Sequence, residues 1–550
     1  MPFDSAYPPL SIPDVDLFSF LFDRNDREFP DDHVILVDVT TRTQHTYRHI
    51  CETAEKFGKG LKSHWNWQKG DVMAIFSPNS AEIASATFGT QWAGGVVCPF
   101  NNQYTTTELA SQLKSSQSKG LLTHVTCLQV AREAARLAGL PWSRIIVVGE
   151  QDPEGRCRHY SSLFDDSTAI KKASIDPEND LSFLVYSSGT TGLPKGVMLS
   201  HKNIVANVLQ VTIPDLGNVN WQRDQYLGFL PMYHIYGEFC IAVSVLAPVY
   251  RGLTMHIMQK FDLDCLCQVI QESKIAIVYV VPPVVLLLAK HPVVDKYDLS
   301  SLRMLHSSAA PLTDDLVGMI HKRLKVPIKQ GYGMSEASPG IAGQPWNDWN
   351  KTIGSAGTLA PSMSMKLVNN AGTEVPIGEE GEIWIKGPNI FKGYFQNPEA
   401  TAEAVDADGW YRTGDIGYVD KNHNIYITDR VKELIKYNGF QVAPAQLEGI
   451  LLAHPAVNDV AVVGLSSPAK ATELPRAYIV PAQGFKGDDE KLAREISDWL
   501  DRRVAPYKRL RGGIKFIEVI PKSAAGKVLR RLLVEQAKKE ESQTLGTWKL

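Results

Sequence analysis

The sequence predicts an α/β protein with a large N-terminal domain of doubly wound, mostly parallel sheets plus a β-rich subdomain, and a small mobile α+β C-terminal domain. Three observations lead to this prediction. The chain has 550 residues, more than one hydrophobic core usually organises. Short β-branched runs alternate with amphipathic helical patterns along much of it. After residue 354 the pattern changes to short strands separated by Gly, Asn and Asp turns.

The first third of the chain carries the clearest alternation. Strand-like apolar runs are separated by helical patterns, the strands at 71–79, 96–101, 119–125 and 144–150 and the helices at 80–95, 105–116 and 127–140. Such βα units build a mostly parallel sheet with helices on both faces. Asn79–Ser80 and Thr105–Thr106 are the candidate N-caps of the first two helices.

The most apolar stretch, residues 275–289, is too short to cross a bilayer, which takes about 20 residues. Pro282 and Pro283 interrupt it, so we expect a buried strand followed by the start of a helix. The N-terminus lacks the basic start and apolar run of a secretory signal. These features predict a cytoplasmic protein without stable membrane insertion; the final "WKL" only weakly resembles the S-K-L peroxisomal address.

Composition narrows the function further. A formal net charge of −3 favours neither nucleic acid nor an anionic membrane as partner. Seven cysteines, an odd number without regular spacing, indicate free thiols in a reducing compartment. We expect small molecules as partners and a monomer or homodimer.

A β-rich subdomain and a second domain follow. Strand patterns at 365–376, 381–389 and 417–430 predict the subdomain, and a new βα pattern begins near residue 431. We therefore place the boundary within 429–432, giving a large N-terminal domain at 1–429 and a small C-terminal domain at 430–550.

The stretch "VYSSGTTGLPKGVMLSH", residues 185–201, is a Ser/Thr/Gly loop between two apolar runs. Glycines let the backbone wrap closely around a ligand, and consecutive N–H and hydroxyl groups donate to anionic oxygens. Lys195 adds a positive charge, so a polyphosphate is the expected ligand. The loop is not a Walker A motif, because Lys195 lies between Pro194 and Gly196.

The loop resembles the signature of the adenylate-forming superfamily, which comprises acyl- and aryl-CoA synthetases, luciferases and peptide-synthetase adenylation domains. Four further stretches match in the same order: "QGYGMSEAS" at 330–338, "YRTGDIGYVD" at 411–420, "DRVKELIKYNGFQVAPAQLE" at 429–448 and "PKSAAGKVLRR" at 521–531. With "PMYHIYGE" and "SSAAPL" added, the sequence is most similar to 4-coumarate–CoA ligase-like enzymes. The resemblance implies that a carboxylic acid and MgATP form an acyl-adenylate and pyrophosphate, and that the acyl group then passes to CoA.

The resemblance also implies a nucleotide site. Its candidate residues are Ser187, Ser188, Gly189, Thr190, Thr191, Gly192 and Lys195 at the phosphates, Gln330, Gly331 and Tyr332 at the adenine, Ser335 at a phosphate, Asp415 and Arg430 at the ribose, and Ile427 beside them. Glu336 is the candidate Mg²⁺ ligand, in keeping with the preference of Mg²⁺ for one or two carboxylates plus phosphate oxygens.

Two faces of the C-terminal domain are expected to act in turn. By resemblance, Lys527 bridges the substrate carboxylate and the α-phosphate during adenylation, and it also counts among the nucleotide contacts. Rotation about Lys432 then brings the face of Lys436, Gly439 and Gln441 to the adenylate. The candidate CoA contacts are Lys260, Asn438 and Gly439, and Asn438 replaces a lysine frequent in relatives.

The acid pocket is expected to be lined by an aromatic residue and small residues, with His234 orienting the carboxylate. Its members are His234, Tyr236, Cys240, His306, Ser308, Ala309, Gly333 and Gln441. A ring-sized slot favours an aryl or arylalkenoic acid, and His306 could hydrogen-bond a phenol. Relatives of the coumarate type often carry lysine at this position, so benzoate-like, cinnamate-like and aliphatic acids stay open.

Three other activities remain as alternatives: a medium- or long-chain fatty acyl-CoA synthetase, a luciferase-like oxygenase, and a peptide-synthetase-type adenylating enzyme. A binding protein that kept the fold but lost the chemistry should lack a charged member of the set. Here the charged residues Lys195, Glu336, Asp415, Arg430, Lys436 and Lys527 are all present.

Overall fold

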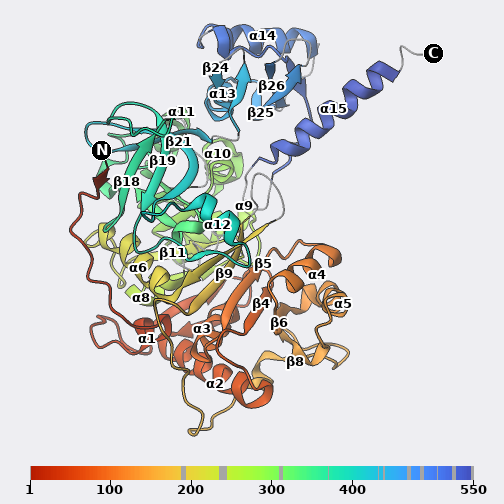
Figure 1. The fold of residues 1–550 in the computed structure, drawn as a ribbon. Helices are drawn as coiled ribbons and strands as arrows, with labels where there is room; N and C mark the ends of the chain where they lie inside the picture. The colour runs from red at the N-terminus through yellow and green to blue at the C-terminus, as the bar shows by residue number, and fades with distance from the viewer. Residues whose placement is uncertain are drawn as a thin grey trace.

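The computed structural model describes residues 2–187, 194–233, 245–308, 312, 314–369, 371–430, 433–437, 440–467, 472–482, 489–504, 506–522 and 528–546. For Ser187, Asp429, Arg430, Lys436, Phe440, Gln441 and residues 541–546 it describes the backbone alone. A large N-terminal part and a small C-terminal part follow one another along the chain (Figure 1). The predicted fold class is confirmed.

The first of the N-terminal sheets has eight strands in the described part of the chain, in the order β20-β10-β9-β5-β4-β6-β7-β8. The strands are β4 (Val72–Phe76), β5 (Val96–Phe100), β6 (Gly120–His124), β7 (Ile145–Val148), β8 (Arg158–His159), β9 (Leu181–Ser187), β10 (Lys195–Ser200) and β20 (Gly393–Tyr394). Neighbours from β9 to β8 are parallel, whereas β10 runs antiparallel to both β9 and β20. Helices α3 (Glu82–Trp92), α4 (Thr106–Ser115) and α5 (Leu128–Ala138) connect consecutive strands.

Strand β4 shows why these strands are apolar throughout. Met73 and Ile75 belong to the large core on one face of the sheet, while Ala74 and Phe76 belong to a second core on the other face. A parallel strand covered on both sides has no solvated face, so the period-two alternation of a half-exposed strand is lost.

The second sheet has nine strands among the described residues, in the order β17-β16-β15-β14-β13-β11-β12-β2-β3. They are β2 (Val34–Asp38), β3 (Gln44–Thr46), β11 (Gln225–Gly228), β12 (Thr254–Ile257), β13 (Ile277–Val280), β14 (Met304–Ser307), β15 (Ile328–Gly333), β16 (Gly340–Gly343) and β17 (Thr358–Leu359). The helices around the two sheets include α1 (Leu17–Phe22), α2 (Tyr47–Trp65), α6 (His201–Thr212), α8 (Ala247–Arg251), α9 (Leu263–Ser273), α10 (Pro282–Lys290) and α11 (Asp314–Leu324). As predicted, the apolar stretch at 275–289 forms a buried strand followed by a helix that begins at Pro282.

The β-rich subdomain is an antiparallel sheet in the order β1-β18-β19-β21-β22. Its strands are β1 (Phe3–Asp4), β18 (Ser364–Val368), β19 (Gly381–Lys386), β21 (Tyr411–Val419) and β22 (Ile425–Arg430), with helix α12 (Pro398–Ala404) between β20 and β21. Met365, Ile383 and Tyr411 belong to the same hydrophobic core as the two large sheets. The subdomain is thus part of the N-terminal body.

The C-terminal part has its own cores. It contains the hairpin β23 (Ile435–Tyr437) and β24 (Phe440–Val442), helix α13 (Pro444–Leu452), a sheet of β25 (Val457–Ser467), β26 (Thr472–Pro481) and β27 (Ile514–Phe516), and helices α14 (Asp489–Asp501) and α15 (Arg530–Gly546). Along β25, Val460 and Val462 face one small core, while Ala461 and Val463 face another. Figure 1 shows α14 above this sheet and the long α15 projecting away from it.

Helix caps show one success and one error of the sequence analysis. Thr105 caps α4 and forms a reciprocal capping box with Glu108. The cap expected at Asn79–Ser80 is wrong, because α3 begins one residue later and its N-cap is Ala81. The Asn79 side chain instead donates to the carbonyls of Leu230 and Met258 at 2.9 and 3.1 Å, joining the two large sheets. Among the described residues no helix is long and apolar enough to span a bilayer.

Candidate active site

The predicted phosphate loop is framed by an antiparallel hairpin. Ser187 is the last residue of β9 and Lys195 the first of β10, and the two residues are paired across the hairpin. Residues 188–193, which include the candidates Ser188, Gly189, Thr190, Thr191 and Gly192, lie outside the described residues. A Cβ atom on Gly196 would lie 3.0 Å from Leu184 Cδ1, so a larger residue there would press against that side chain. The hairpin therefore holds the base of the loop firmly.

Lys195 and Glu336 meet at one tyrosine ring. The Lys195 Nζ lies 4.8 Å from the ring centroid of Tyr394, and the Tyr394 hydroxyl donates to Glu336 Oε1 at 2.9 Å. Glu336 belongs to a short turn after β15, is 8% exposed, and its carbonyl accepts the Phe391 N–H at 2.9 Å. A cation and an anion are thus held on either side of one buried aromatic residue.

The tyrosines around Glu336 stay protonated. Burial, followed by the Glu336 charge, raises the pKa of Tyr394 far above its ordinary value, and the same causes raise the pKa of Tyr411. Tyr394 consequently remains a donor to the Glu336 carboxylate at every physiological pH.

A second buried carboxylate, Asp415 on β21, contacts a tyrosine near the end of β15. The Tyr332 hydroxyl donates to Asp415 Oδ2 at 2.6 Å, and Asp415 is 1% exposed. Asp415 is paired with Arg430 across β21 and β22, and Ile427 lies on β22 three residues before Arg430. Gln330 is held by its own backbone N–H, which donates to Gln344 Oε1, and by its side-chain oxygen, which accepts the Leu312 N–H; both bonds are 2.8 Å. The structure therefore brings together the candidates for the adenine and the ribose.

His306 and the glycines of β15 are in close contact. A Cβ atom on Gly331 would come within 2.8 Å of His306 Nε2, and one on Gly333 within 2.4 Å of the Pro339 carbonyl. The Ser308 hydroxyl donates to the Gly331 carbonyl at 2.8 Å. Burial, helped by the charge of Lys329, lowers the pKa of His306 well below its ordinary value, so its imidazole is neutral.

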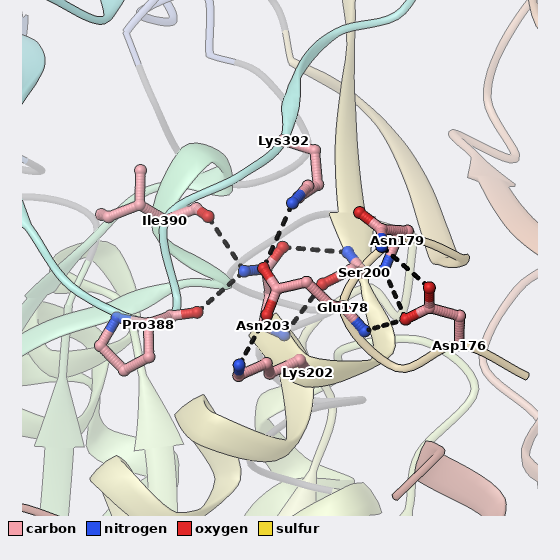
Figure 2. Close-up of polar contacts among 9 residues, drawn as sticks. All are labelled: Asp176, Glu178, Asn179, Ser200, Lys202, Asn203, Pro388, Ile390 and Lys392. Carbon is pink, nitrogen blue, oxygen red and sulfur yellow. Dashed lines mark hydrogen bonds and ion pairs between the residues drawn. The ribbon is translucent and has the colours of Figure 1, made fainter. Parts of the chain in front are cut away.

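Figure 2 shows a polar cluster that joins the hairpin to the segment carrying Tyr394. Asn203, in the first turn of α6, donates to the Pro388 and Ile390 carbonyls at 2.8 and 3.0 Å and accepts the Ser200 N–H at 3.0 Å. Glu178 forms ion pairs with Lys202 and Lys392, whose Nζ atoms lie 2.6 and 3.3 Å from its carboxylate oxygens. The hydrogen bonds of the Asn203 amide and the half-exposed ion pairs of Glu178 together fix the end of β10 beside β20.

Comparison with known proteins identifies the family. The model of the AMP-binding enzyme family matches residues 22–395, and that of the AMP-binding enzyme C-terminal domain matches residues 446–527. The chain belongs to the AMP-binding enzyme family. It is 38% identical to "Probable 4-coumarate--CoA ligase 1" of Dictyostelium discoideum over 96% of this chain and 97% of the relative. It is 37% identical to "4-coumarate--CoA ligase 1" of Petroselinum crispum over 96% and 95% of the two chains.

Solved structures agree with this AMP-binding enzyme in fold. The crystal structure of ATP-bound MatB from Rhodopseudomonas palustris has a TM-score of 0.81 and 27% identity, covering 95% of this chain and 99% of that one. An anthranilate CoA ligase in complex with anthranoyl-AMP superposes with a TM-score of 0.85 at 24% identity, covering 97% and 99%, and supports the fold alone. The predicted superfamily and the prediction of an AMP-forming acid–CoA ligase are confirmed by the family and the curated relatives.

Many predicted site residues of the AMP-binding enzyme fall on parts of the chain that are not described. These are His234, Tyr236, Cys240, Ala309, Lys432, Asn438, Gly439 and Lys527; for Ser187, Arg430, Lys436 and Gln441 the backbone alone is described. The exposed Lys260 follows β12, and Ser335 is buried next to Glu336. The roles assigned to these residues, and the domain boundary at 429–432, stay predictions.

Two residues at the centre of the site were missed by the sequence analysis. Tyr411 opens the matched stretch at 411–420 and could have been found there. Tyr394 lies in "FKGYF", which carries no charge beside the ring apart from Lys392 and gives no local sign of its contacts. Its place depends on the pairing of β20 with β10, almost 200 residues earlier in the chain.

Proposed function

We propose that this enzyme activates an aryl or arylalkenoic carboxylic acid with ATP, releases pyrophosphate, and transfers the acyl group to CoA. The observation that carries the proposal is the pair of buried carboxylates, Glu336 beside Lys195 and Asp415 under Tyr332. Glu336 with Lys195 suits a phosphate chain and its cation, whereas Asp415 with Tyr332 suits a sugar with two hydroxyls. Curated relatives named 4-coumarate–CoA ligase support the reaction class.

In the proposed nucleotide site, Lys195 and the hydroxyls and amides of 187–192 bind the β- and γ-phosphates, and Ser335 reaches a phosphate as well. Asp415 accepts hydrogen bonds from the ribose hydroxyls, with Arg430 beside it and Ile427 packed nearby. Gln330, Gly331 and Tyr332 form the wall against the adenine. Tyr332 has a double task, because the hydroxyl that orients Asp415 belongs to the ring that stacks on the base.

The residues present fit Mg²⁺ with Glu336 as its protein ligand. Mg²⁺ takes one or two carboxylates plus substrate phosphates, and Glu336 is a buried carboxylate oriented by a permanent donor. When bound, the ion neutralises charge on the phosphates and so lowers the repulsion between ATP and the incoming carboxylate. Among the described residues no cluster of three or more His, Cys, Asp or Glu forms an all-protein cage.

The proposed adenylation step brings the acid carboxylate, oriented by His234, in line with the α-phosphate. Lys527 then holds both anions and stabilises the charge that builds up between them. After pyrophosphate leaves, rotation about Lys432 replaces Lys527 by the face of Lys436, Gly439 and Gln441. CoA enters along Lys260 and Asn438. Its thiol attacks the acyl carbonyl of the adenylate, the bond to phosphate breaks, and AMP and the thiol proton are released as the thioester forms.

The acid itself is proposed to be uncharged at its far end. His306 is neutral and lies 5.0 Å from the Tyr279 ring, measured between ring centroids. A neutral imidazole next to an aromatic ring suits a phenol or a plain ring, whereas a second carboxylate would lose its hydration without gaining a counter-charge. Tyr236, Cys240, Ser308, Ala309 and Gly333 would complete the slot. A cytoplasmic site of action and a monomeric or dimeric state stay predictions.

A panel of acids tests this proposal. Purified enzyme with MgATP and CoA is supplied with hydroxycinnamates, benzoates, medium- and long-chain fatty acids and a dicarboxylate, and the thioester and pyrophosphate are quantified. Aryl and arylalkenoic acids are expected to give the highest kcat/KM, and the dicarboxylate the lowest. Thioester formation from fatty acids alone would replace the proposed substrate class by the aliphatic one.

A further inference from the structure

Tyr394 is fixed to the hairpin that carries the phosphate loop. The neighbouring residues are tied to β10 by two backbone bonds: Phe395 N–H donates to the Gly196 carbonyl at 2.7 Å and Lys392 N–H to the Met198 carbonyl at 2.9 Å. The Tyr394 N–H donates to Thr401 Oγ1 at 2.9 Å. With the side chain 8% exposed, the ring has little freedom to move relative to Lys195.

Two opposite charges use different parts of this ring. The hydroxyl donates to Glu336 Oε1 at 2.9 Å, a charge-assisted hydrogen bond that fixes the rotation of the carboxylate. The face of the ring lies 4.8 Å from Lys195 Nζ, within the range of a cation–π attraction. The hydroxyl and the ring face can therefore be removed separately by substitution.

The surroundings hold the ring from the remaining sides. Phe391 packs edge-on against both Tyr394 and Tyr411, with centroids 4.9 and 5.2 Å away. The Phe391 N–H also binds the Glu336 carbonyl, so the same segment holds the backbone and the side chain of Glu336. Asn203 holds this segment through hydrogen bonds to the Pro388 and Ile390 carbonyls (Figure 2).

We propose that Tyr394 is the positioning residue that keeps Glu336 and Lys195 in a fixed relation, so that the cation and the phosphates of one MgATP are bound jointly. The inference rests on the proposed function, since it assigns Glu336 to Mg²⁺ and Lys195 to phosphate. Its consequence is specific: the hydroxyl acts on the magnesium side of the nucleotide, and the ring face acts on the phosphate side.

Direct binding separates the two contributions. ATP is titrated by calorimetry into wild type, Tyr394→Phe and Tyr394→Leu, once with Mg²⁺ and once with EDTA. Tyr394→Phe loses a hydrogen bond to a buried charge, so it should bind MgATP about ten-fold more weakly than wild type. Its affinity for metal-free ATP should stay within about two-fold of wild type. Tyr394→Leu also removes the ring face, so its binding of metal-free ATP should fall about three- to ten-fold.

Tyr418→Phe is the matched control. Tyr418 is a partly exposed tyrosine on β21 whose ring stacks on Tyr426 at 4.7 Å, so loss of its hydroxyl should leave both titrations unchanged. The inference is overturned if Tyr394→Phe binds MgATP like wild type, or if it loses equal affinity with and without Mg²⁺. The binding test needs no turnover, so it decides the role of Tyr394 even if the enzyme activates no acid. A wild type that binds MgATP but activates no acid would count against the proposed function alone.

Discussion

The nucleotide cradle is the proposed ATP site around Lys195, Glu336 and Asp415. It stabilises its charged groups in a different way from the C-terminal domain. In the cradle, Glu336 and Asp415 are each held by a tyrosine hydroxyl inside one continuous core that spans the two large sheets. The C-terminal domain has two small cores, and near its predicted catalytic segments it relies on an ionic cluster. The contrast indicates a site that is built in advance in the large core, and a small body with cores of its own on which the predicted reacting lysines lie.

The ionic cluster is centred on Arg530. Its guanidinium pairs with Glu433 at 2.9 Å and with Glu448 at 2.8 Å, and its Nε donates to the Val462 carbonyl at 3.2 Å. All three charged side chains are less than one-fifth exposed. Arg530 follows Lys527 by three residues, and Glu433 directly follows Lys432, so the cluster ties together the two predicted catalytic segments.

The largest effect is expected from Lys527→Ala. Loss of the charge that bridges carboxylate and α-phosphate should slow adenylate formation by ~10²–10³-fold, while thioester formation from supplied acyl-AMP survives. Lys436→Ala should show the reverse pattern. The two half-reactions are measured separately, by pyrophosphate release and by consumption of synthetic acyl-AMP; equal damage to both in either variant would contradict the division of labour.

Arg530→Met should destabilise the C-terminal domain and leave the stability of the N-terminal domain unchanged. Two largely buried carboxylates lose their partner, which is expected to cost about 3 kcal/mol in the free energy of unfolding of that domain. Hydrogen exchange in urea, followed by mass spectrometry on peptides from α13 and β25, reports on that domain. Arg531→Met is the control, because Arg531 is 84% exposed and pairs with Glu535 at 3.5 Å. Equal stability of the two variants would show that the cluster contributes nothing.

Acid should weaken the large core. Burial lowers the pKa of His256, whose Nε2 donates a 2.6 Å hydrogen bond to Gln225 Oε1, to about 4 from an ordinary 6.5. Between pH 6.5 and 4 the unfolded chain therefore binds more protons at this histidine than the folded chain does. As the pH falls through this range, the free energy of unfolding decreases by up to about 3 kcal/mol relative to its value above pH 6.5. His256→Gln should flatten the dependence of the urea midpoint between pH 7.5 and 5; an unchanged slope would refute this assignment.

The smallest effects belong to the cluster in Figure 2. Asn203→Ala leaves the Pro388 and Ile390 carbonyls without their donor and should cost about 1–3 kcal/mol of stability, with a higher KM for ATP. Lys392→Met removes a half-exposed ion pair with Glu178 and should cost less than about 1 kcal/mol. Thermal unfolding and ATP saturation curves compare them, and an Lys392→Met variant as damaged as Asn203→Ala would reverse this ranking.

The parts of the account that the sequence could predict are those encoded locally. The alternation of βα units, the Ser/Thr/Gly loop between two apolar runs, and the candidates Glu336 and Asp415 all lie in short contiguous patterns. Tyr394 could not be found, because its two contacts depend on a strand pairing between distant segments. Asn79 misled for the same reason: a residue with strong capping preference was recruited by carbonyls of the second sheet.

The most direct test of the central claim is exchange of labelled pyrophosphate into ATP. Wild-type enzyme with Mg²⁺ and an aryl or arylalkenoic acid is predicted to exchange label without CoA, because adenylation is reversible and precedes the thiol. Omission of the acid or of Mg²⁺ should abolish the exchange. An enzyme that binds MgATP yet exchanges no label with any acid of a broad panel would contradict the claim that this cradle forms acyl-adenylates.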